Sequence, residues 1–320
     1  SGFNGLGKVL IGQINPSGRT TDTWAADFTK DPSFVNFGDF TYEDLQVSYS
    51  SSALSSAASN AKVTPDATFV NYAEGIYVGY RYYETAAVEG FIDYDSAVVY
   101  PFGYGLSYTD FSKTVVNQNL GETDDTISVD VQVTNTGAAA GKDVVELYYS
   151  APYTKGGIEK SSVVLAGFAK THIIEPGASE TVNVTFKVED MASYDYETAK
   201  AYVLERGDYT ITVQDDSHHV SEGVAPMTYT VPETIVYDKD NPRSSDKSVA
   251  TNEFDDVSGE FSDTAEAGKI RNMSRADFAA TFPTSPLGTD LMHASEAAKL
   301  GFAEYDTKAA ADAFEGEMPK

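Results

Sequence analysis

The stretch ISVDVQVTNTG, from Ile127 to Gly137, alternates strictly between apolar and polar side chains. A period of two places the two sets on opposite faces of an extended chain, so the stretch predicts a half-buried antiparallel β-strand. Its apolar face is formed by Ile127, Val129, Val131 and Val133. The turn residues Asn135-Thr136-Gly137 predict where the strand ends.

The same pattern recurs along the chain up to about Tyr237. Five further stretches predict strands: Asp143–Ser150, Ser162–Thr171, Glu180–Val188, Lys200–Leu204 and Asp208–Asp215. About seven short strands with turn signals between them are typical of an immunoglobulin-like or fibronectin-like β-sandwich. Because the chain has no cysteine pair and no lone strand tryptophan, the fibronectin-like type is favoured.

The residues before about 108 have a mixed pattern. A short helix is predicted at about 3–11 because its apolar residues fall at helical spacing, and Gly12 ends it. The segment Phe69–Thr85 is rich in aromatic residues, and packing is the favoured interpretation. Tyr77, Tyr80 and Tyr83 are therefore expected to be half-buried rings that cover the face of a domain. Ser274 is expected to cap a helix N-terminus near the other end of the chain.

Composition excludes several function classes. The formal net charge is −27, from 49 acidic and 22 basic residues, which argues against nucleic acid and anionic membranes as partners. The absence of cysteine excludes thiol nucleophiles and cysteine-bound zinc. The histidines do not form an H-E-x-x-H motif, and no apolar run is long enough to span a bilayer. Neither a metal nor a cofactor is predicted.

Sequence motifs for nucleophilic or nucleotide-binding chemistry are also missing, among them G-x-S-x-G and the Gly-rich phosphate loops. Glu74, Glu84 and Glu89 lie near the aromatic segment and are candidates for general acid/base work. The favoured alternative is that they form salt bridges to Arg81 or are simply exposed.

Three motifs in the first part of the chain carry a family resemblance: NPSGR (Asn15–Arg19), EGIYVGYRYYET (Glu74–Thr85) and YPFGYGLSYTDF (Tyr100–Phe111). In this order and spacing they resemble the C-terminal half of glycoside hydrolase family 3 enzymes. The β-region continues the resemblance to about residue 235 through Val133–Pro152, Leu165–Thr171, Glu175–Val182 and Gly207–Val213.

The resemblance implies a multidomain chain of α+β and all-β parts. Residues 1–108 would be the C-terminal part of an α/β-sandwich domain, and 109–237 a fibronectin type III-like β-sandwich. Residues 238–320 would be a linker or arm leading to a (β/α)8 barrel that is not in this chain, as in the permuted members of the family. We therefore expect the chain to be a fragment, a processed piece or one of two subunits.

The implied activity is that of a retaining, exo-acting β-glycosidase, with β-glucosidase as the first choice and β-xylosidase or α-arabinofuranosidase next. The family's nucleophilic Asp lies on the barrel, and its acid/base Glu lies upstream of Ser1. No catalytic residue is therefore assigned here, and the chain alone is expected to be inactive. The expected partners are a β-glucoside or oligosaccharide and the remainder of the enzyme, and a homo-oligomer is left open. A bacterial cytoplasmic location is favoured over a secreted one.

A non-catalytic module that binds polysaccharide or a protein partner is the alternative function. Trp24, Tyr148, Tyr149 and Tyr153 would then be the rings that stack on sugars.

The neutral, ring-rich segment Tyr100–Phe111 is expected to be a seam between two domains. Pro101 would fix the chain, Gly103 and Gly105 would let the backbone turn or approach closely, and the rings would be buried.

Overall fold

The computed structural model describes residues 2–37, 41–46, 49–50, 62–63, 66–68, 70, 72–121, 125–246, 271–280 and 291–292. Contacts divide the chain into two compact units. The first unit holds the described parts of 1–28, 76–251 and 274–278, and the second holds those of 29–75, 252–273 and 279–320.

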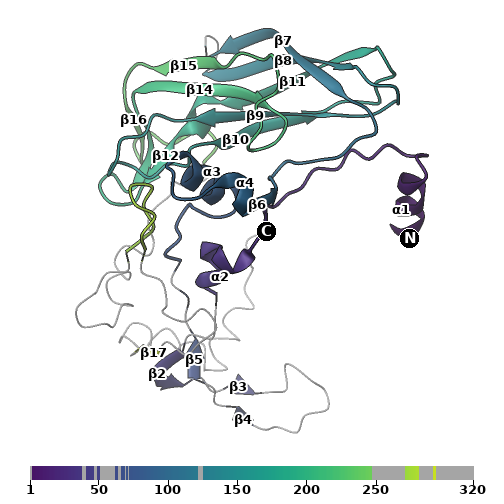
Figure 1. Cartoon of the computed structure of the whole chain (residues 1–320). Coiled ribbons are helices and arrows are strands. Elements are labelled where there is room, and N and C mark those ends of the chain that lie inside the picture. Colours follow the sequence, from purple (N-terminus) through teal and green to yellow (C-terminus); the bar gives the residue numbers. More distant parts are fainter. Residues whose placement is uncertain are drawn as a thin grey trace. The chain divides into compact units, whose positions relative to one another are not determined.

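Two antiparallel sheets form a β-sandwich in the first unit (Figure 1). One sheet has the strand order β11 (Ser179–Lys187), β8 (Thr126–Asn135), β7 (Phe111–Leu120). The other has the order β10 (Val164–Lys170), β9 (Val144–Ser150), β14 (Gly207–Gln214), β15 (Met227–Val231). The predicted β-sandwich is thus confirmed, and all six stretches that predicted strands contain one.

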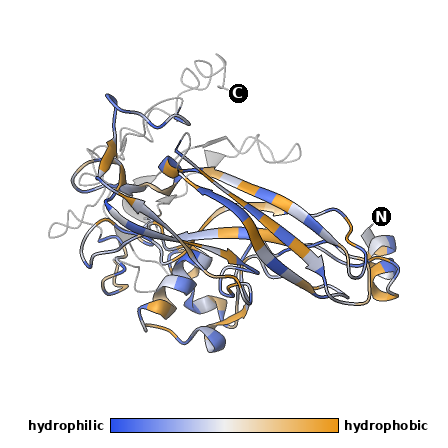
Figure 2. Ribbon diagram, turned by 90° about the horizontal axis from the view of Figure 1, so that it is seen from above, coloured by the Kyte–Doolittle hydropathy of each residue, from blue (hydrophilic) through white to orange (hydrophobic). Residues whose placement is uncertain are grey.

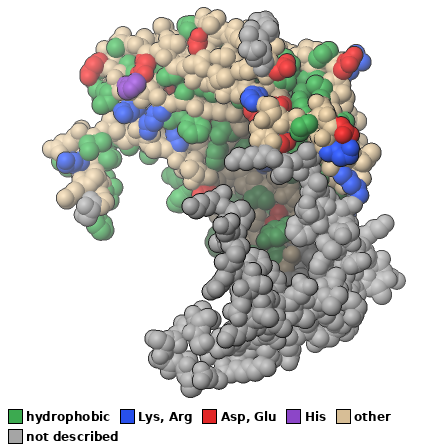
Figure 3. Space-filling model, turned by 180° about the vertical axis from the view of Figure 1, so that it is seen from behind, with side chains coloured by type: hydrophobic (Ala, Val, Ile, Leu, Met, Phe, Trp, Pro, Cys, Tyr) green, Lys and Arg blue, Asp and Glu red, His purple; other side chains and the backbone are tan. Residues whose placement is uncertain are grey.

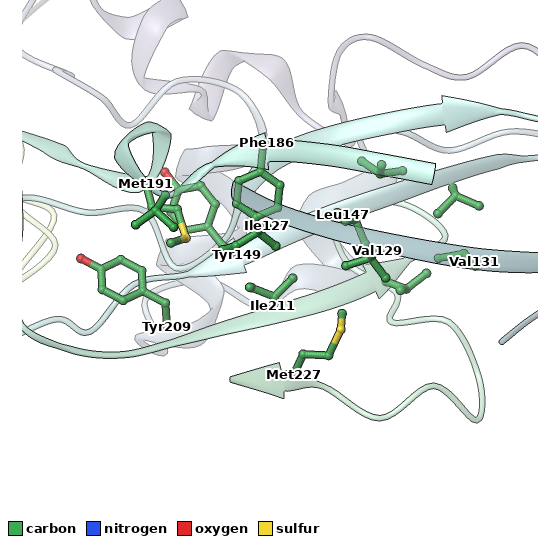
Figure 4. Close-up of a cluster of buried hydrophobic side chains, with 14 of the residues drawn as sticks. Ile127, Val129, Val131, Leu147, Tyr149, Phe186, Met191, Tyr209, Ile211 and Met227 are labelled. Atoms are coloured by element: carbon green, nitrogen blue, oxygen red, sulfur yellow. The ribbon is translucent and has the colours of Figure 1, made fainter. Parts of the chain in front are cut away.

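Side chains from both sheets meet in one apolar core (Figure 4). Ile127, Val129, Val131 and Val133 of β8 are fully buried, as the alternation predicted. They face Leu147 of β9 and Ile211 of β14, which are also fully buried. Figure 2 shows the same alternation as orange and blue bands along the strands. Burial of this face fixes the register, because a shift by one residue would turn the apolar set outward.

Several short elements complete the first unit. A small sheet has the order β12 (Ser193–Asp195), β13 (Ala201–Leu204), β16 (Ile235–Tyr237), and β1 (Trp24–Ala25) pairs with β6 (Val98–Tyr100). A 3-10 turn covers Val188–Met191. After β16 the chain stays against β13, where the guanidinium of Arg243 lies 3.6 Å from the centre of the Tyr202 ring.

Two helices of the first unit lie beside the four-stranded sheet: α3 (Tyr80–Val88) and α4 (Tyr94–Ala97) (Figure 1). The backbone N–H of Leu165 in β10 donates to the Tyr80 hydroxyl at 3.1 Å, which ties α3 to this sheet. Tyr83, Tyr94 and Val98 form a separate small apolar cluster. Tyr77 and Tyr83 are 0% and 4% exposed, so the expectation of half-buried rings holds for Tyr80 and is wrong for these two.

The predicted N-terminal helix is observed as α1 (Gly2–Leu10), and Gly12 follows it with a φ of 74°. None of its residues is buried. The helix predicted after Ser274 is wrong: the chain makes a single turn, closed by the Phe278 N–H donating to the Ser274 carbonyl at 2.7 Å.

The second unit contains α2 (Pro32–Val35), a sheet in the order β17 (Leu291–Met292), β2 (Thr41–Gln46), β5 (Asp66–Thr68), and the pair β3 (Tyr49–Ser50) with β4 (Lys62–Val63). A 3-10 turn at Phe28–Lys30 precedes it. Asp31 caps α2, because its carboxylate accepts from the Ser33 N–H at 2.8 Å and Pro32 follows at the first helical position.

Candidate functional site

The two sequence motifs nearest the β-sandwich lie side by side in the first unit. Thr20, just after NPSGR, donates its N–H to the Tyr104 carbonyl at 2.8 Å and accepts from the Gly103 N–H at 2.9 Å. The Asn15 side chain accepts from the Tyr108 N–H at 2.8 Å and donates to the Ala140 carbonyl at 3.1 Å. These bonds connect both motifs to the loop that precedes β9.

The segment Tyr100–Phe111 also contacts the β-sandwich directly. The Ser217 N–H, in the loop after β14, donates to the Phe102 carbonyl at 2.8 Å. Gly103 has a φ of 85°, and a Cβ there would lie 2.5 Å from the Glu146 carboxylate of β9. Glycine is therefore required twice, for the left-handed backbone and for the close approach. We call Asn15–Thr20, Tyr100–Phe111 and the loop 214–219 the joint.

The joint is not the ring-filled seam that the sequence predicted. Tyr100 is 41% exposed and Tyr108 is 52% exposed, while Phe102 and Tyr104 are half-buried. The expectation that these rings would all be buried is wrong. Gly103 lets the backbone approach Glu146 closely, and backbone hydrogen bonds from Thr20 and Ser217 connect the segment to its neighbours.

A network of alternating charges lies beside the joint. Asp143 pairs with Arg19 of the NPSGR motif and with Lys113 of β7 at 3.4 Å. Lys113 also lies 2.5 Å from Asp215, whose carboxylate accepts from the Ser221 hydroxyl at 2.7 Å. Burial alone would raise the pKa of Asp215, but the nearby Lys113 ammonium holds it below its ordinary value.

These charges border a cavity of about 300 Å³. Its lining includes Arg19, Lys113, Lys142, Asp143 and Asp215. Since Asp143 and Asp215 are already neutralised by cations, the cavity presents paired charges rather than a carboxylate ready to attack or protonate a substrate.

Glu146 is a buried acid at the joint, only 4% exposed. It accepts a hydrogen bond from the Tyr148 hydroxyl at 2.7 Å. Burial raises the pKa of Glu146 to about 7, although Tyr148 and the cations Arg19 and Lys113 oppose the shift. Its charge therefore depends on pH near neutrality.

Glu84 of α3 is the centre of a second polar cluster, which joins the helices to the sandwich. Its carboxylate accepts from the Tyr94 hydroxyl at 2.7 Å and the Ser217 hydroxyl at 2.8 Å, and His218 Nδ1 lies 2.8 Å away. The His218 ring stacks on Tyr94 with the ring centres 3.6 Å apart. Burial raises the pKa of Glu84, against the effect of these donors.

The other two candidate acids are also engaged. In the second unit Glu74, 6% exposed, accepts from the Asn36 amide at 2.6 Å. In the first unit Glu89 pairs with Arg275 at 2.7 Å. Within the first unit, Glu84 and Glu89 have different partners, and Glu74 belongs to the second unit. The expected salt bridges to Arg81 are thus not observed for these three residues, and the expected exposure is right for Glu89 alone, which is exposed and pairs with Arg275.

The aromatic residues proposed for sugar stacking are mostly inaccessible. Tyr148 is fully buried and Tyr149 is 8% exposed, so their rings offer no face to a ligand. The Tyr153 ring is covered by the guanidinium of Arg275 at 4.4 Å. Trp24 is 59% exposed and packs edge-on against Tyr100. Three of the four residues therefore do not support the binding-module hypothesis.

Sequence reasoning missed most of the polar residues of the joint. Ser217 and His218 belong to the stretch Asp215–His219, in which three polar or acidic residues and two histidines follow a predicted strand directly. That density of polar side chains at a strand end was the available signal. Tyr94 and Lys113 gave no such signal, because each stands alone in an ordinary pattern.

The joint is therefore a structural contact with buried, titratable acids.

Within the part of the chain that the structure describes, no group of three His, Asp or Glu side chains could hold a metal ion. Among the described helices, none is long and apolar enough to cross a membrane. Figure 3 shows acidic and basic side chains interspersed over the visible described surface, with no single-sign field.

The two-sheet arrangement defines the class of the sandwich. Residues 143–217, from the start of β9 to the loop after β14, match the family model described as "Fibronectin type III-like domain".

Other matches are longer than the 75 residues of this domain model. Over 219 residues the chain is 37% identical to "Beta-glucosidase A" of Butyrivibrio fibrisolvens, covering 63% of this chain and 22% of that protein. It is 35% identical over 226 residues to "Beta-glucosidase" of Ruminococcus albus, covering 69% of this chain and 20% of that protein. Among solved structures, a β-glucosidase from Paenibacillus barengoltzii superimposes with a TM-score of 0.56 at 32% identity, covering 72% of this chain and 22% of that one.

The chain is thus related to the β-glucosidases of glycoside hydrolase family 3, as the motifs indicated. It spans about a fifth to a quarter of the length of the relatives it matches.

Proposed function

We propose that this chain supplies the scaffold and the joint of a retaining, exo-acting β-glycosidase that removes terminal β-linked glucose. The catalytic carboxylates, in this proposal, lie on parts of the enzyme outside the chain. Its partners are a β-glucoside or oligosaccharide and the remainder of the enzyme, including a (β/α)8 barrel. The domain limits proposed from the sequence, 1–108, 109–237 and 238–320, belong to the same proposal.

One observation carries the proposal. The matched relatives are β-glucosidases, and the match covers about 20–22% of the first two of them. Within the described residues of the first unit, the acids of the joint are committed to structural partners: Glu84 to Tyr94 and His218, and Asp143 to Arg19. Such a unit can connect neighbouring domains of an enzyme, but these carboxylates are poorly placed to attack or protonate a glycoside.

Retaining hydrolysis needs two carboxyl groups about 5–5.5 Å apart. One attacks the anomeric carbon and forms a covalent glycosyl-enzyme as the leaving group departs. The other protonates the leaving oxygen and then takes a proton from the water that releases the sugar. No residue of this chain is assigned to either role.

The proposal is tested by hydrolysis of an aryl β-glucoside. This chain alone is expected to release aryl alcohol no faster than buffer. When the chain is joined to its missing barrel and upstream segment, hydrolysis should appear, and NMR should show β-glucose as the first product. Turnover by the isolated chain at the rate of an intact enzyme would contradict the placement of the carboxylates. An intact protein that is inactive on β-glucosides but binds cellulose or xylan would favour the binding module.

A further inference from the structure

A short turn, Ser274–Phe278, contacts residues of the first unit that are far from it in the sequence. In this turn, the Arg275 N–H donates to the Glu159 carboxylate at 2.8 Å. The guanidinium of Arg275 donates to Glu89 at 2.7 Å and to the Lys160 carbonyl at 3.3 Å. Arg275 is only 9% exposed, so these protein groups rather than water surround its positive charge.

The surface that receives Arg275 fits a guanidinium better than an ammonium. Glu89 accepts from Nε, the Lys160 carbonyl accepts from a terminal nitrogen, and the face of the Tyr153 ring lies 4.4 Å away. A lysine could not donate in these directions and lie flat over the ring at the same time. Glu159 is itself fixed, because it also accepts from the buried Tyr77 hydroxyl at 2.5 Å.

Phe278 is the second contact of the turn. Its ring centre lies 5.3 Å from that of Tyr77, 5.9 Å from that of Tyr82 and 5.1 Å from that of Phe91. Phe278 has a φ of 50°, a left-handed conformation that costs about 1–2 kcal/mol for a residue with a Cβ. The three surrounding rings offset this cost, so the packing holds the backbone in its unfavourable conformation.

We propose that the receiving surface is a docking site for an Arg-x-x-Phe segment, occupied in the folded chain by Ser274–Phe278. We call the surface the cradle, and it consists of Tyr77, Tyr82, Glu89, Phe91, Tyr153 and Glu159. Glu89 receives the guanidinium of the arginine, Glu159 receives its backbone N–H, and three rings receive the phenylalanine. The cradle therefore selects both the side chains and their spacing. Docking of this turn fixes residues 274–278 on the first unit, whatever the activity of the parent enzyme.

The covalent connection makes docking efficient. A tethered segment experiences a high effective concentration near its site, so modest contacts suffice to keep it bound. The same segment supplied as a separate peptide must bind without this advantage and should dock more weakly. An unoccupied cradle should nevertheless accept it.

Hydrogen exchange of the full chain tests the cis contact. In the double variant Arg275→Ala/Phe278→Ala, amides of 274–280 should exchange at least about tenfold faster than in the wild type, while amides of β8 and β9 keep their protection. The control Arg206→Ala removes the same charge from an exposed position of the first unit and should leave both unchanged. Arg275→Lys keeps the charge without the planar fork and should be intermediate. Unchanged exchange at 274–280 in the double variant would overturn the proposal.

A labelled peptide with the sequence of 271–280 tests recognition in trans by fluorescence anisotropy. It should bind the double variant, whose cradle is vacated, at least about tenfold more tightly than the wild type. A peptide with alanine in place of both anchor residues should lose that binding. Equal binding to both proteins, or no saturable binding up to about 1 mM, would show that the cradle does not recognise the segment. If the double variant loses protection throughout β8 and β9, Glu89→Gln tests the contact from the cradle side: amides of 274–280 should exchange faster than in the wild type, and unchanged exchange there would overturn the proposal.

Discussion

The β-sandwich and the layer formed by α3 and α4 are stabilised in different ways. The sandwich core contains 20 buried apolar residues, most of them from the two sheets, whereas the helical layer has a buried cluster of three: Tyr83, Tyr94 and Val98. The layer is attached to the sandwich by polar contacts instead, chiefly those of Glu84 with Tyr94, Ser217 and His218. Apolar burial makes the sandwich self-sufficient, while the layer depends on a few hydrogen bonds to it.

The largest effect should come from the sandwich core. Leu147→Ala removes a fully buried side chain and leaves a cavity between the sheets, which should lower the free energy of unfolding by about 3 kcal/mol. Urea denaturation followed by circular dichroism measures this loss. The control Ile173→Ala removes a side chain that is 62% exposed and should cost less than about 0.5 kcal/mol. Equal effects of the two changes would contradict the assignment of the core.

The joint should respond to pH through Glu146. Since its pKa is about 7 in the fold and the ordinary value is 4.5, the native state binds the proton more tightly than the unfolded state. Stability from this group is complete below pH 4.5 and is lost as pH rises through 7, by about 2–3 kcal/mol. Glu146→Gln, which keeps the shape without the charge, should remove this dependence. A stability curve between pH 4.5 and 8 that is parallel for both proteins would refute it.

Loss of the Glu84 carboxylate should loosen the helical layer before the sandwich. Glu84→Ala leaves the buried donors of Tyr94 and Ser217 without an acceptor, at a cost of about 2 kcal/mol. Hydrogen exchange should accelerate in α3 and α4 while β8 and β9 stay protected. Glu84→Gln retains acceptor capacity and should have a smaller effect. Uniform acceleration across both regions would mean that they unfold as one unit.

The smallest effects should distinguish two neighbouring histidines. His218 stacks on Tyr94 and contacts Glu84, so His218→Ala should cost about 1 kcal/mol, detected mainly in the exchange of α4. The His219 side chain is 62% exposed and its ring contacts Asp216, so His219→Ala should cost less than about 0.5 kcal/mol. A larger loss of stability in His219→Ala than in His218→Ala would contradict the prediction that His218 connects this loop to α4.

The sandwich could be predicted from the sequence because burial on one face of a strand leaves a local, periodic record. The alternation from Ile127 to Val133 specified both the strand and its buried face. The edge strands β7 and β15 were not individually predicted. An edge position is not the reason, because the edge strands β10 and β11 were predicted. The residues of β7 are mostly exposed or half-buried, so this strand has no regular alternation of buried and exposed side chains.

The joint could be located by its motifs but not described. Its contacts connect residues more than 80 positions apart, such as Thr20 with Pro101 and Glu84 with Ser217, and no periodic pattern records such pairs. The aromatic residues of Tyr100–Phe111 suggested buried rings, because hydrophobic content indicates burial only on average. The conformation of Gly103 and the exposure of Tyr100 and Tyr108 left no such record in the sequence.

The chain leaves the first unit after Phe28 and enters it again at Ile76, so residues 29–75 are an insertion, and the residues on both sides of it belong to the first unit. Thr20 and Gly103 lie on either side of this insertion, and a backbone hydrogen bond connects them. Lengthening such a loop costs only about 0.6 kcal/mol for each doubling of its length. The entropy of loop closure therefore opposes extra residues between Phe28 and Ile76 only weakly, as long as both ends keep their place in the first unit.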